Sequence, residues 1–414
     1  MGTTVVNLAA ETWWSAPRHL SYAIVFLLGA ALAAIATATM RFRPNPDRLT
    51  SRRDQHRRLR DKPRVGGLAI FLAFLLSPLL AAAIFGDVAD IIESDWEALA
   101  APYIAGAIIV VLGAYDDVWV ADFKTKFMGQ ALAGLVLFLM DYRVDQLGIP
   151  WGSGSIEFET GWVALPLTLF WVILVSNAVN LVDGKDGVAA GVGLIATSSL
   201  AVVALDVDRD LQALMLFALA GATAGFLPFN FPPARRLLGD SGALFIGFTV
   251  AALSIEAARG PGGAMFFAIP ILVLGFPLFD TLLAAVRRFL ESRHPFFGDE
   301  DHIHHRIERV LGFGPRQLVI SLWAITALFA AAGLSLHLIE GFAMEIAAFT
   351  MFAGLILGIT VALEYHGSMW NAPRLHPIRR RLGLRADEIP AFDPAAVSPR
   401  EPALSIKDHD SLPR

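Results

Sequence analysis

Long apolar segments dominate this chain and restrict its fold more than any other feature. A helix that spans the hydrocarbon core of a bilayer needs roughly 20 mostly apolar residues, and about eleven segments of this chain approach that length. They lie at residues 20–40, 66–85, 100–114, 127–141, 162–177, 188–205, 210–228, 241–257, 263–286, 317–338 and 342–364. The pattern predicts an all-α polytopic integral membrane protein. In the ninth segment, Pro270 and Pro277 are expected to bend or break the helix.

Composition supports this class and excludes several others. Hydrophobic residues make up 55% of the 414 residues and charged residues only 17%, which gives a mean hydropathy of +0.57. Such values lie outside the range of soluble globular domains. The chain has no cysteine, so disulfides, iron–sulfur clusters and thiolate zinc sites are excluded. We expect a transmembrane domain over residues 20–365, between an outer N-terminal segment 1–19 and a tail 366–414, and no nucleic-acid partner.

The positions of Lys and Arg predict the orientation of the chain. Loop 41–64 is rich in both, whereas loop 86–99 contains neither and carries acidic residues. Cytoplasmic loops are the ones enriched in Lys and Arg, so the first loop is expected inside and the second outside. Alternation then places the N-terminus outside and the C-terminal tail in the cytoplasm. Every polar cluster described below falls on the cytoplasmic side, which predicts an active site on that face of a bacterial inner membrane.

The most informative polar cluster is the stretch 177–187, which reads NAVNLVDGKDG and follows an apolar run. Its polar side chains are those of Asn177, Asn180, Asp183 and Asp186. Such groups are costly within a bilayer and are expected at its edge with a function. Amide and carboxylate oxygens are the ligands that hard cations prefer. The alternative is a polar turn in which these side chains serve only as structural caps.

Two further acidic clusters precede or follow apolar segments. Asp116 and Asp117 are adjacent carboxylates whose mutual repulsion a cation or a lysine such as Lys126 can relieve. Asp240 stands between glycines in the sequence LGDSG, where it is a candidate metal ligand near a diphosphate. The alternatives are a solvated loop for the first pair and a helix N-cap at Asp240 or Ser241.

The last two clusters are basic or glycine-rich. The first of them contains His302, His304, His305 and Arg306. Such a group can contact phosphate oxygens, and a zinc site or an ordinary surface loop are the alternatives. The second is the sequence PRVGG at 63–67, where Gly66 and Gly67 either approach a ligand closely or serve only for helix packing.

Taken together and in this order, the clusters resemble the polyprenyl-phosphate N-acetylhexosamine-1-phosphate transferases. The matching stretches are PRVGG at 63–67, GAYDD at 113–117, NAVNLVDGKDG at 177–187, GDSG at 239–242 and HIHH at 302–305. The resemblance implies transfer of N-acetylglucosamine 1-phosphate from UDP-N-acetylglucosamine to undecaprenyl or decaprenyl phosphate, with release of UMP. It also implies Mg²⁺ as the cofactor, with Mn²⁺ as an alternative. Ile303 interrupts the histidine run that is typical of the peptidoglycan branch of the family, which argues against that branch.

The resemblance also implies roles for individual residues. Catalytic roles fall to Asp116, Asp117, Asp183, Asp186, His302, His304 and His305. Substrate-binding roles fall to Lys126, Asn177, Asn180, Asp183, Arg306, Gly66 and Gly67. The implied metal ligands are Asn180 and Asp240. Members of this family often form homodimers.

Two alternative functions remain open from the sequence. The first is the same reaction with another UDP-N-acetylhexosamine as donor. The second is an ion-coupled transporter, because carboxylates and broken helices in a membrane also mark carriers. A transporter predicts polar groups near the membrane midplane and internally related halves. This chain shows neither, since its polar clusters lie on one side and no internal repeat is visible.

Overall fold

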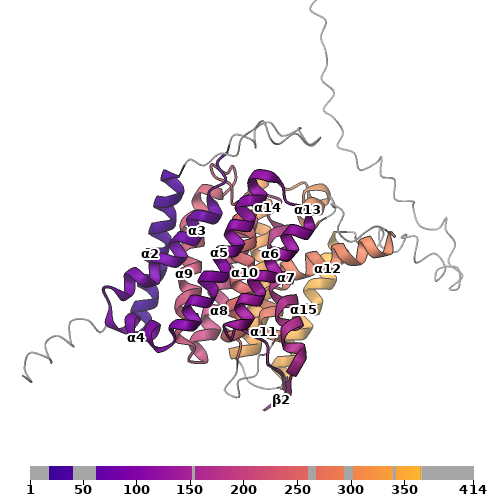
Figure 1. The fold of residues 1–414 in the computed structure, drawn as a ribbon. Helices are drawn as coiled ribbons and strands as arrows, with labels where there is room; N and C mark the ends of the chain where they lie inside the picture. The colour runs from indigo at the N-terminus through magenta and orange to yellow at the C-terminus, as the bar shows by residue number, and fades with distance from the viewer. Residues whose placement is uncertain are drawn as a thin grey trace, which may run out of the picture.

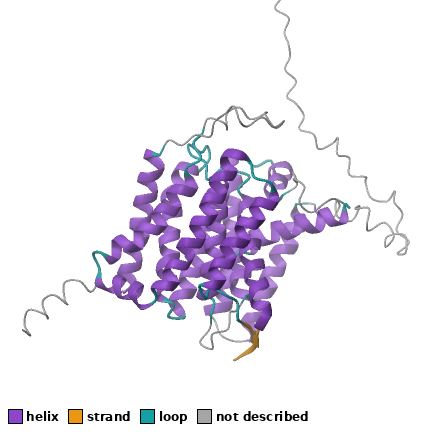
Figure 2. Cartoon of the chain, in the orientation of Figure 1, coloured by secondary structure: helices purple, strands orange, loops and turns teal. Residues whose placement is uncertain are grey.

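The computed structural model describes residues 18–40, 62–151, 154–259, 267–292, 302–338, 342–363 and 365. Within them the chain forms a bundle of helices packed side by side (Figures 1 and 2). The helices are α2 (Arg18–Thr39), α3 (Gly66–Ala82), α4 (Gly86–Ser94), α5 (Trp96–Trp119), α6 (Phe123–Leu139), α7 (Ala164–Val182), α8 (Val188–Asp206), α9 (Asp210–Asn230), α10 (Gly239–Ala257), α11 (Ala268–Val273), α12 (Gly275–Leu290), α13 (Ile303–Leu311), α14 (Pro315–Leu338) and α15 (Phe342–Ala362). The strands are β1 (Gln146–Trp151) and β2 (Gly154–Glu159).

The helices confirm a multi-pass membrane protein. Among the described residues, seven helices are long and apolar enough to cross a bilayer, namely α2, α5, α7, α8, α9, α10 and α14. An eighth span results if α3 and α4, which meet at 114°, are counted as one broken span. Each of the eleven apolar segments found in the sequence coincides with helix. The full count of eleven spans nevertheless stays a prediction, because α6 and α12 are only 17 and 16 residues long.

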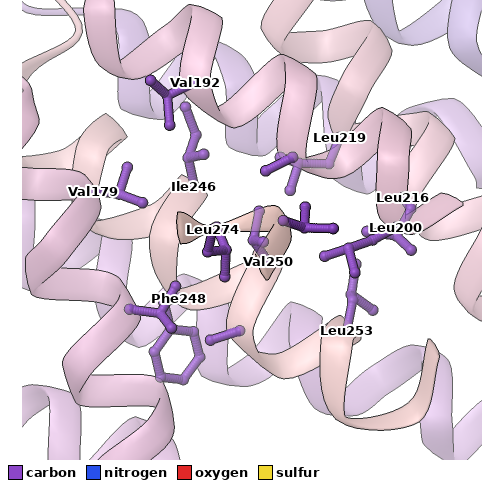
Figure 3. Close-up of a cluster of buried hydrophobic side chains, with 14 of the residues drawn as sticks. Val179, Val192, Leu200, Leu216, Leu219, Ile246, Phe248, Val250, Leu253 and Leu274 are labelled. Carbon is purple, nitrogen blue, oxygen red and sulfur yellow. The ribbon is translucent and has the colours of Figure 1, made fainter. Parts of the chain in front are cut away.

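Helix α10 lies at the centre of the bundle. It packs against α3, α5, α7, α8 and α9, and its apolar side chains point in every direction (Figure 3). Ile246, Phe248 and Val250 are fully buried among side chains such as Val179 of α7 and Leu219 of α9. A helix that is apolar all round is expected in such a buried position. The first turn of α10 is thereby held in a fixed place at one end of the bundle.

The outer helix α2 crosses α9 at very short range. Gly221 and Gly225 of α9 face the backbone of α2 at Phe26 and Ala30. A Cβ atom on Gly225 would lie 2.7 Å from the carbonyl carbon of Ala30, closer than real Cβ atoms approach backbone. Small residues four positions apart let two membrane helices approach in this way. The two glycines therefore set the distance between α2 and α9.

Two predicted helix ends and two predicted loops were wrong. Helices α5 and α7 continue to Trp119 and Val182, so Asp116, Asp117 and Asn180 lie in the last turns of helices and not in loops. The predicted outer loop 142–161 contains an antiparallel β-hairpin, with Gln146 opposite Glu159, so the chain is not entirely α-helical. The predicted loop 287–316 contains α13. Its nine residues bury one face against the bundle, a length too short to stand out in a search for spans.

The predicted break in the ninth segment is confirmed. Helix α11 ends at Val273 and α12 begins at Gly275, with Pro270 in the first helix and Pro277 in the first turn of the second. Helix α12 then runs obliquely to its neighbours and its C-terminal end projects from the bundle (Figure 1). Most of the Arg-rich loop 41–64, most of the N-terminal segment 1–19 and the tail 366–414 lie outside the described residues.

Candidate active site

The predicted polar residues converge at one end of the bundle. Asp116 and Asp117 are on the last turns of α5, and Asn177 and Asn180 are on the last turns of α7. Lys126 lies on the first turns of α6, and Asp240 lies on the first turn of α10. Asp183 and Asp186 are in the short connection from α7 to α8; His304 and His305 are on α13, and His302 immediately precedes it. In Figure 1 this end carries the α13 label, and strand β2 lies at the opposite end.

A polar cavity of about 250 Å³ lies at this end of the bundle, between the ends of α7 and α9, the α7–α8 connection and the start of α10. Its lining includes Arg64, Asn180, Asp183, Gly184, Lys185, Asp186, Asn230, Gly239 and Asp240. Four of these were predicted as site residues, namely Asn180, Asp183, Asp186 and Asp240. The cavity therefore brings together amide and carboxylate oxygens of residues as far apart in the sequence as Asn180 and Asp240.

Lys126 bridges two of the acidic residues. Its Nζ contacts Asp116 Oδ2 and lies 3.4 Å from Asp240 Oδ1. Burial disfavours the charged ammonium, but the nearby Asp240 and Asp116 outweigh it and raise the pKa of Lys126 above its usual value. The other oxygen of Asp116 accepts a 2.7 Å hydrogen bond from the backbone N–H of Ala121. Lys126 is thus a fixed positive charge beside two carboxylates.

Asp183 lies where negative charge is most crowded. Burial raises the pKa of its carboxyl well above the usual range, and Asp240, Asp117 and Asp186 raise it further, while Arg64 opposes them. A bound cation would relieve this crowding. Asp186, in contrast, is tied into the protein: its Oδ2 accepts a 2.9 Å hydrogen bond from the N–H of Ala234.

The donor atoms around the cavity fit a hard cation such as Mg²⁺. Asn180 and Asp240 both line the cavity and both offer oxygen. In the part of the chain that the structure describes, no three carboxylate or imidazole groups converge to form a complete metal cage. Mg²⁺ commonly takes only one or two protein carboxylates and completes its coordination with phosphate and water oxygens. The residues present therefore fit a cation that binds together with a diphosphate.

The histidines are carried by α13, which an acid on α12 holds in place. Asp280 accepts a 2.9 Å hydrogen bond from the N–H of Ile303 through Oδ1, and its Oδ2 lies 2.9 Å from Nδ1 of His302. The Asp280 side chain is buried. It therefore caps the start of α13 and orients His302 at the same time. Sequence reasoning missed Asp280, because a single acid inside an apolar segment has no recognisable motif around it.

His304 faces the connection between α7 and α8. It is only 3% exposed, and a Cβ atom on Gly184 would lie 2.7 Å from its Nε2. Burial, and then the neighbouring His305, lowers the pKa of His304 to about 3. Its Nε2 has no hydrogen-bond partner among the described residues. His304 is therefore a neutral imidazole at physiological pH, available for a hydrogen bond but not as a positive charge.

Three predicted substrate-binding residues are engaged within the protein. Arg306 donates a 2.9 Å hydrogen bond to the carbonyl of Leu363, and its guanidinium lies 3.9 Å from the ring centre of Tyr365. Gly66 and Gly67 pack against the start of α10, which is the helix-packing alternative raised from the sequence. Substrate-binding roles for these three residues stay predictions.

Asn177 has a partner on the neighbouring helix. Its Nδ2 donates hydrogen bonds of 2.7 Å to Gln130 Oε1 and to the carbonyl of Ile173. This pair joins α6 to α7 just below Lys126 and Asn180. The predicted substrate-binding role of Asn177 likewise stays a prediction.

Sequence reasoning missed three residues that line the cavity. Arg64 lies inside the PRVGG motif, where only the glycines drew attention, and it donates a 3.2 Å hydrogen bond to Asp117. Asn230 accepts a 2.9 Å hydrogen bond from the N–H of Gly187, and no sequence pattern marks it. Lys185 forms an ion pair with Glu308 of α13 at 2.6 Å. That pair joins the α7–α8 connection to the helix that carries the histidines.

Comparisons with known proteins cover this same region. The profile of glycosyl transferase family 4 matches residues 99–258. The probable undecaprenyl-phosphate N-acetylglucosaminyl 1-phosphate transferase of Bacillus subtilis (strain 168) is 34% identical over 283 residues, which cover 68% of this chain and 75% of that protein. The decaprenyl-phosphate N-acetylglucosaminephosphotransferase of Mycobacterium leprae (strain TN) is 38% identical over 293 residues, with 65% and 72% covered.

A more distant relative covers less of each chain. The phospho-N-acetylmuramoyl-pentapeptide-transferase of Listeria monocytogenes (strain EGD-e, serovar 1/2a) is 34% identical over 211 residues, which cover 48% of this chain and 62% of that protein. The residues matched by the family profile include the ends of α5, α7 and α10. The ends of α7 and α10 line the polar cavity, and Asp117 near the end of α5 contacts the start of α10.

Proposed function

Because this chain belongs to glycosyl transferase family 4, we propose that it transfers N-acetylglucosamine 1-phosphate from UDP-N-acetylglucosamine to undecaprenyl or decaprenyl phosphate. The products are polyprenyl-diphosphate-N-acetylglucosamine and UMP. The relatives from Bacillus subtilis and Mycobacterium leprae carry this activity in their names. The observation that carries the proposal is the polar cavity, where Asn180, Asp183 and Asp240 lie beside the pair formed by Asp116 and Lys126.

The nucleotide sugar occupies the polar cavity in this proposal. Asn180 and Asp240 would hold Mg²⁺, or Mn²⁺ in its place, together with the diphosphate. The bound cation supplies charge neutralisation to the diphosphate oxygens. Arg64 and Lys185 add positive charge at the cavity wall. His304 presents a neutral nitrogen to the same region and contributes a hydrogen bond, while Lys126, Arg64 and Lys185 supply the positive charge.

The lipid phosphate lies beside Lys126 and Asp116. One of its oxygens attacks the phosphorus that carries the sugar, and the bond from that phosphorus to the oxygen bridging to UMP breaks. UMP leaves with the electron pair of that bond. A phosphate monoester is already largely ionised at pH 7, so this attack requires no protein base. Lys126 positions the attacking phosphate and offsets the charge that builds up between the two phosphates. A covalent aspartyl intermediate is the alternative course.

The polyprenyl chain extends from that point into an apolar cavity of about 670 Å³. The cavity lies between the β-hairpin, α7, α11, α12 and α15, beside the broken ninth segment. Leu174 lines it and is about one helical turn before Asn177, so the cavity approaches the polar site along α7. Ala285→Trp fills this cavity without touching the polar residues and is expected to raise KM for the lipid while leaving KM for the nucleotide sugar unchanged.

The same proposal includes the full topology. Eleven spans place the N-terminus outside and the tail 366–414 in the cytoplasm, with the site at the cytoplasmic face of a bacterial inner membrane. This orientation is supported by the position of the site at the end of the bundle where α2 ends and α3 begins, since these are the two helices that the Arg-rich segment 41–64 joins in the sequence. A tag on the C-terminus should be inaccessible from outside intact cells. A tag that is accessible there contradicts the orientation.

The deciding experiment is UMP release by purified protein in detergent. The assay contains UDP-N-acetylglucosamine, undecaprenyl phosphate and Mg²⁺, and each is omitted in turn. Release that needs all three supports the transferase and its donor. Release of UMP only with another UDP-N-acetylhexosamine would show that this sugar nucleotide is the donor and would support the same type of reaction. Absence of release with every donor and lipid contradicts the proposed function. A homodimer stays a prediction that this assay does not address.

A further inference from the structure

The carboxylate of Asp117 is surrounded by hydrogen-bond donors. Oδ1 accepts from the backbone N–H of Asp240 at 3.0 Å and from Arg64 at 3.2 Å. Oδ2 accepts from the backbone N–H of Ser241 at 3.2 Å and from its Oγ at 2.8 Å. Asp117 is 1% exposed, so these donors enclose it almost completely. Its neighbour Asp116 has none of these partners and faces Lys126.

Two of those donors are N–H groups that α10 itself cannot satisfy. Asp240 and Ser241 are the second and third residues of α10, and the first N–H groups of a helix have no acceptor within it. A side chain just before the helix usually accepts them, but Leu238 stands there and provides no cap. Asp117 therefore caps α10 from another helix, and its negative charge also suits the positive end of the helix dipole.

Glycines make room for this contact. Gly239 has φ of +76°, and a Cβ atom there would lie 2.6 Å from Asp117 Oδ2. A Cβ atom on Gly113, one turn before Asp117, would lie 2.6 Å from the backbone nitrogen of Ser241. Side chains at either position would push α5 and α10 apart. The motifs GAYDD and GDSG are thus two halves of one contact.

The side chain of Asp240 leaves the same turn that Asp117 holds. It lines the polar cavity and its Oδ1 lies 3.4 Å from Lys126. We propose that Asp117 is a positioning residue, which caps α10 and thereby fixes the carboxylate of Asp240, and that it takes no direct part in the reaction. This inference rests on the proposed function, in which Asp240 binds the cation. The two adjacent acids then have different roles: Asp116 faces the substrates, and Asp117 holds the first turn of α10 in place.

Cation binding tests this division without relying on turnover. Mn²⁺ is titrated by electron paramagnetic resonance into the full-length protein in detergent, with UDP-N-acetylglucosamine present, lipid absent, and a protein-free titration as the blank. Asp117→Asn replaces one carboxylate oxygen with an NH₂ group, which cannot accept a hydrogen bond from the N–H groups of α10. Hydrogen bonds to charged groups contribute about 1.5–3 kcal/mol, so the Kd for Mn²⁺ should rise roughly tenfold or more.

Ser241→Ala removes one of the four donors to the same carboxylate and leaves both backbone N–H groups in place, so it should raise the Kd by less, about threefold. In the double variant the two effects should not add, since both act through one contact. Asp122→Asn is the matched control: Asp122 caps α6 from an exposed position, where Asn caps equally well. It should leave the Kd unchanged.

Activity gives a second readout. Excess Mg²⁺ should restore much of the turnover of Asp117→Asn, and its pH–rate profile should keep the wild-type limbs. A variant that binds Mn²⁺ like the wild type but has lost turnover overturns the inference alone. If Asp117→Asn does not fold, the Mn²⁺ titration of Ser241→Ala tests the inference instead. An unchanged Kd for Mn²⁺ overturns the inference, and a raised Kd supports it. Wild-type protein that binds no Mn²⁺ in this titration overturns the cation assignment and this inference with it.

Discussion

Replacing His304 with glutamine should make the protein less sensitive to acid. His304 is buried in α13, where burial and the neighbouring His305 lower its pKa from 6.5 to about 3. In the unfolded chain the imidazole is in water and regains the ordinary value near 6.5. The folded protein therefore keeps this side chain neutral over a pH range in which the unfolded chain protonates it.

The sign of the effect follows from proton binding. Between about pH 6.5 and about pH 3 the unfolded state binds one more proton at this site, so the free energy of unfolding falls as the pH falls. The contribution of neutral His304 is fully present above about pH 6.5 and is lost progressively below it. At about pH 5 the loss amounts to roughly 2 kcal/mol. Glutamine does not titrate, so the variant lacks this loss.

Thermal unfolding in detergent measures the difference. The midpoint is recorded at about pH 7.5 and about pH 5 for the wild type and for His304→Gln, without substrates. Contributions of other titrating groups cancel when the two acid-induced decreases are compared. For a chain of this size the wild-type decrease should be larger by about 2 °C. His19→Gln makes the same chemical change at an exposed position on α2 and serves as the control. Equal decreases in wild type and His304→Gln would refute the reasoning.

Three further changes probe other parts of the structure. Lys126→Met keeps the length of the side chain but removes its charge, so kcat should fall about 10²-fold or more. Lys124→Met, at an exposed position on the same helix, should leave kcat within about twofold, and a similar fall in both variants would contradict the role of Lys126. Gly225→Ala should lower stability by roughly 1–3 kcal/mol because the added methyl group meets the backbone of α2. Gly358→Ala has open space on α15 and should not lower stability; equal unfolding midpoints for the two variants would exclude a close helix crossing. Asp280→Asn should lower kcat/KM about tenfold or more through loss of a charge-assisted hydrogen bond; unchanged kinetics would show that the acid serves folding only.

The helices of this bundle were predictable because hydropathy encodes them directly. Each apolar segment became helix, and the prolines at 270 and 277 broke the ninth segment as their chemistry requires. Motifs were predictable for a similar reason, since amides, carboxylates and glycines are out of place at the edge of an apolar run. Of the residues named from those motifs, Asn180, Asp183, Asp186 and Asp240 meet at one cavity.

What the sequence could not supply was the partner of each residue. Asp116 and Asp117 are adjacent and chemically identical, yet one faces Lys126 and the other caps a helix more than a hundred residues away. Asp280 and Asn230 act through hydrogen bonds to residues remote in the chain, so no local pattern marks them. The helix ends also extended past the apolar runs, because backbone hydrogen bonding continues wherever side chains such as Asn180 tolerate it.

The location of the polar cavity at a single end of the bundle has a consequence for traffic across the membrane. In the proposed reaction both substrates meet on one side of the membrane, so the product is formed in the leaflet from which the lipid came. A diphosphate carries several charges, and each charge is costly to move through the hydrocarbon centre of a bilayer. Delivery of the sugar of that product to the opposite leaflet is therefore a separate step that needs another catalyst, and the supply of product on one leaflet sets the concentration gradient that favours this step.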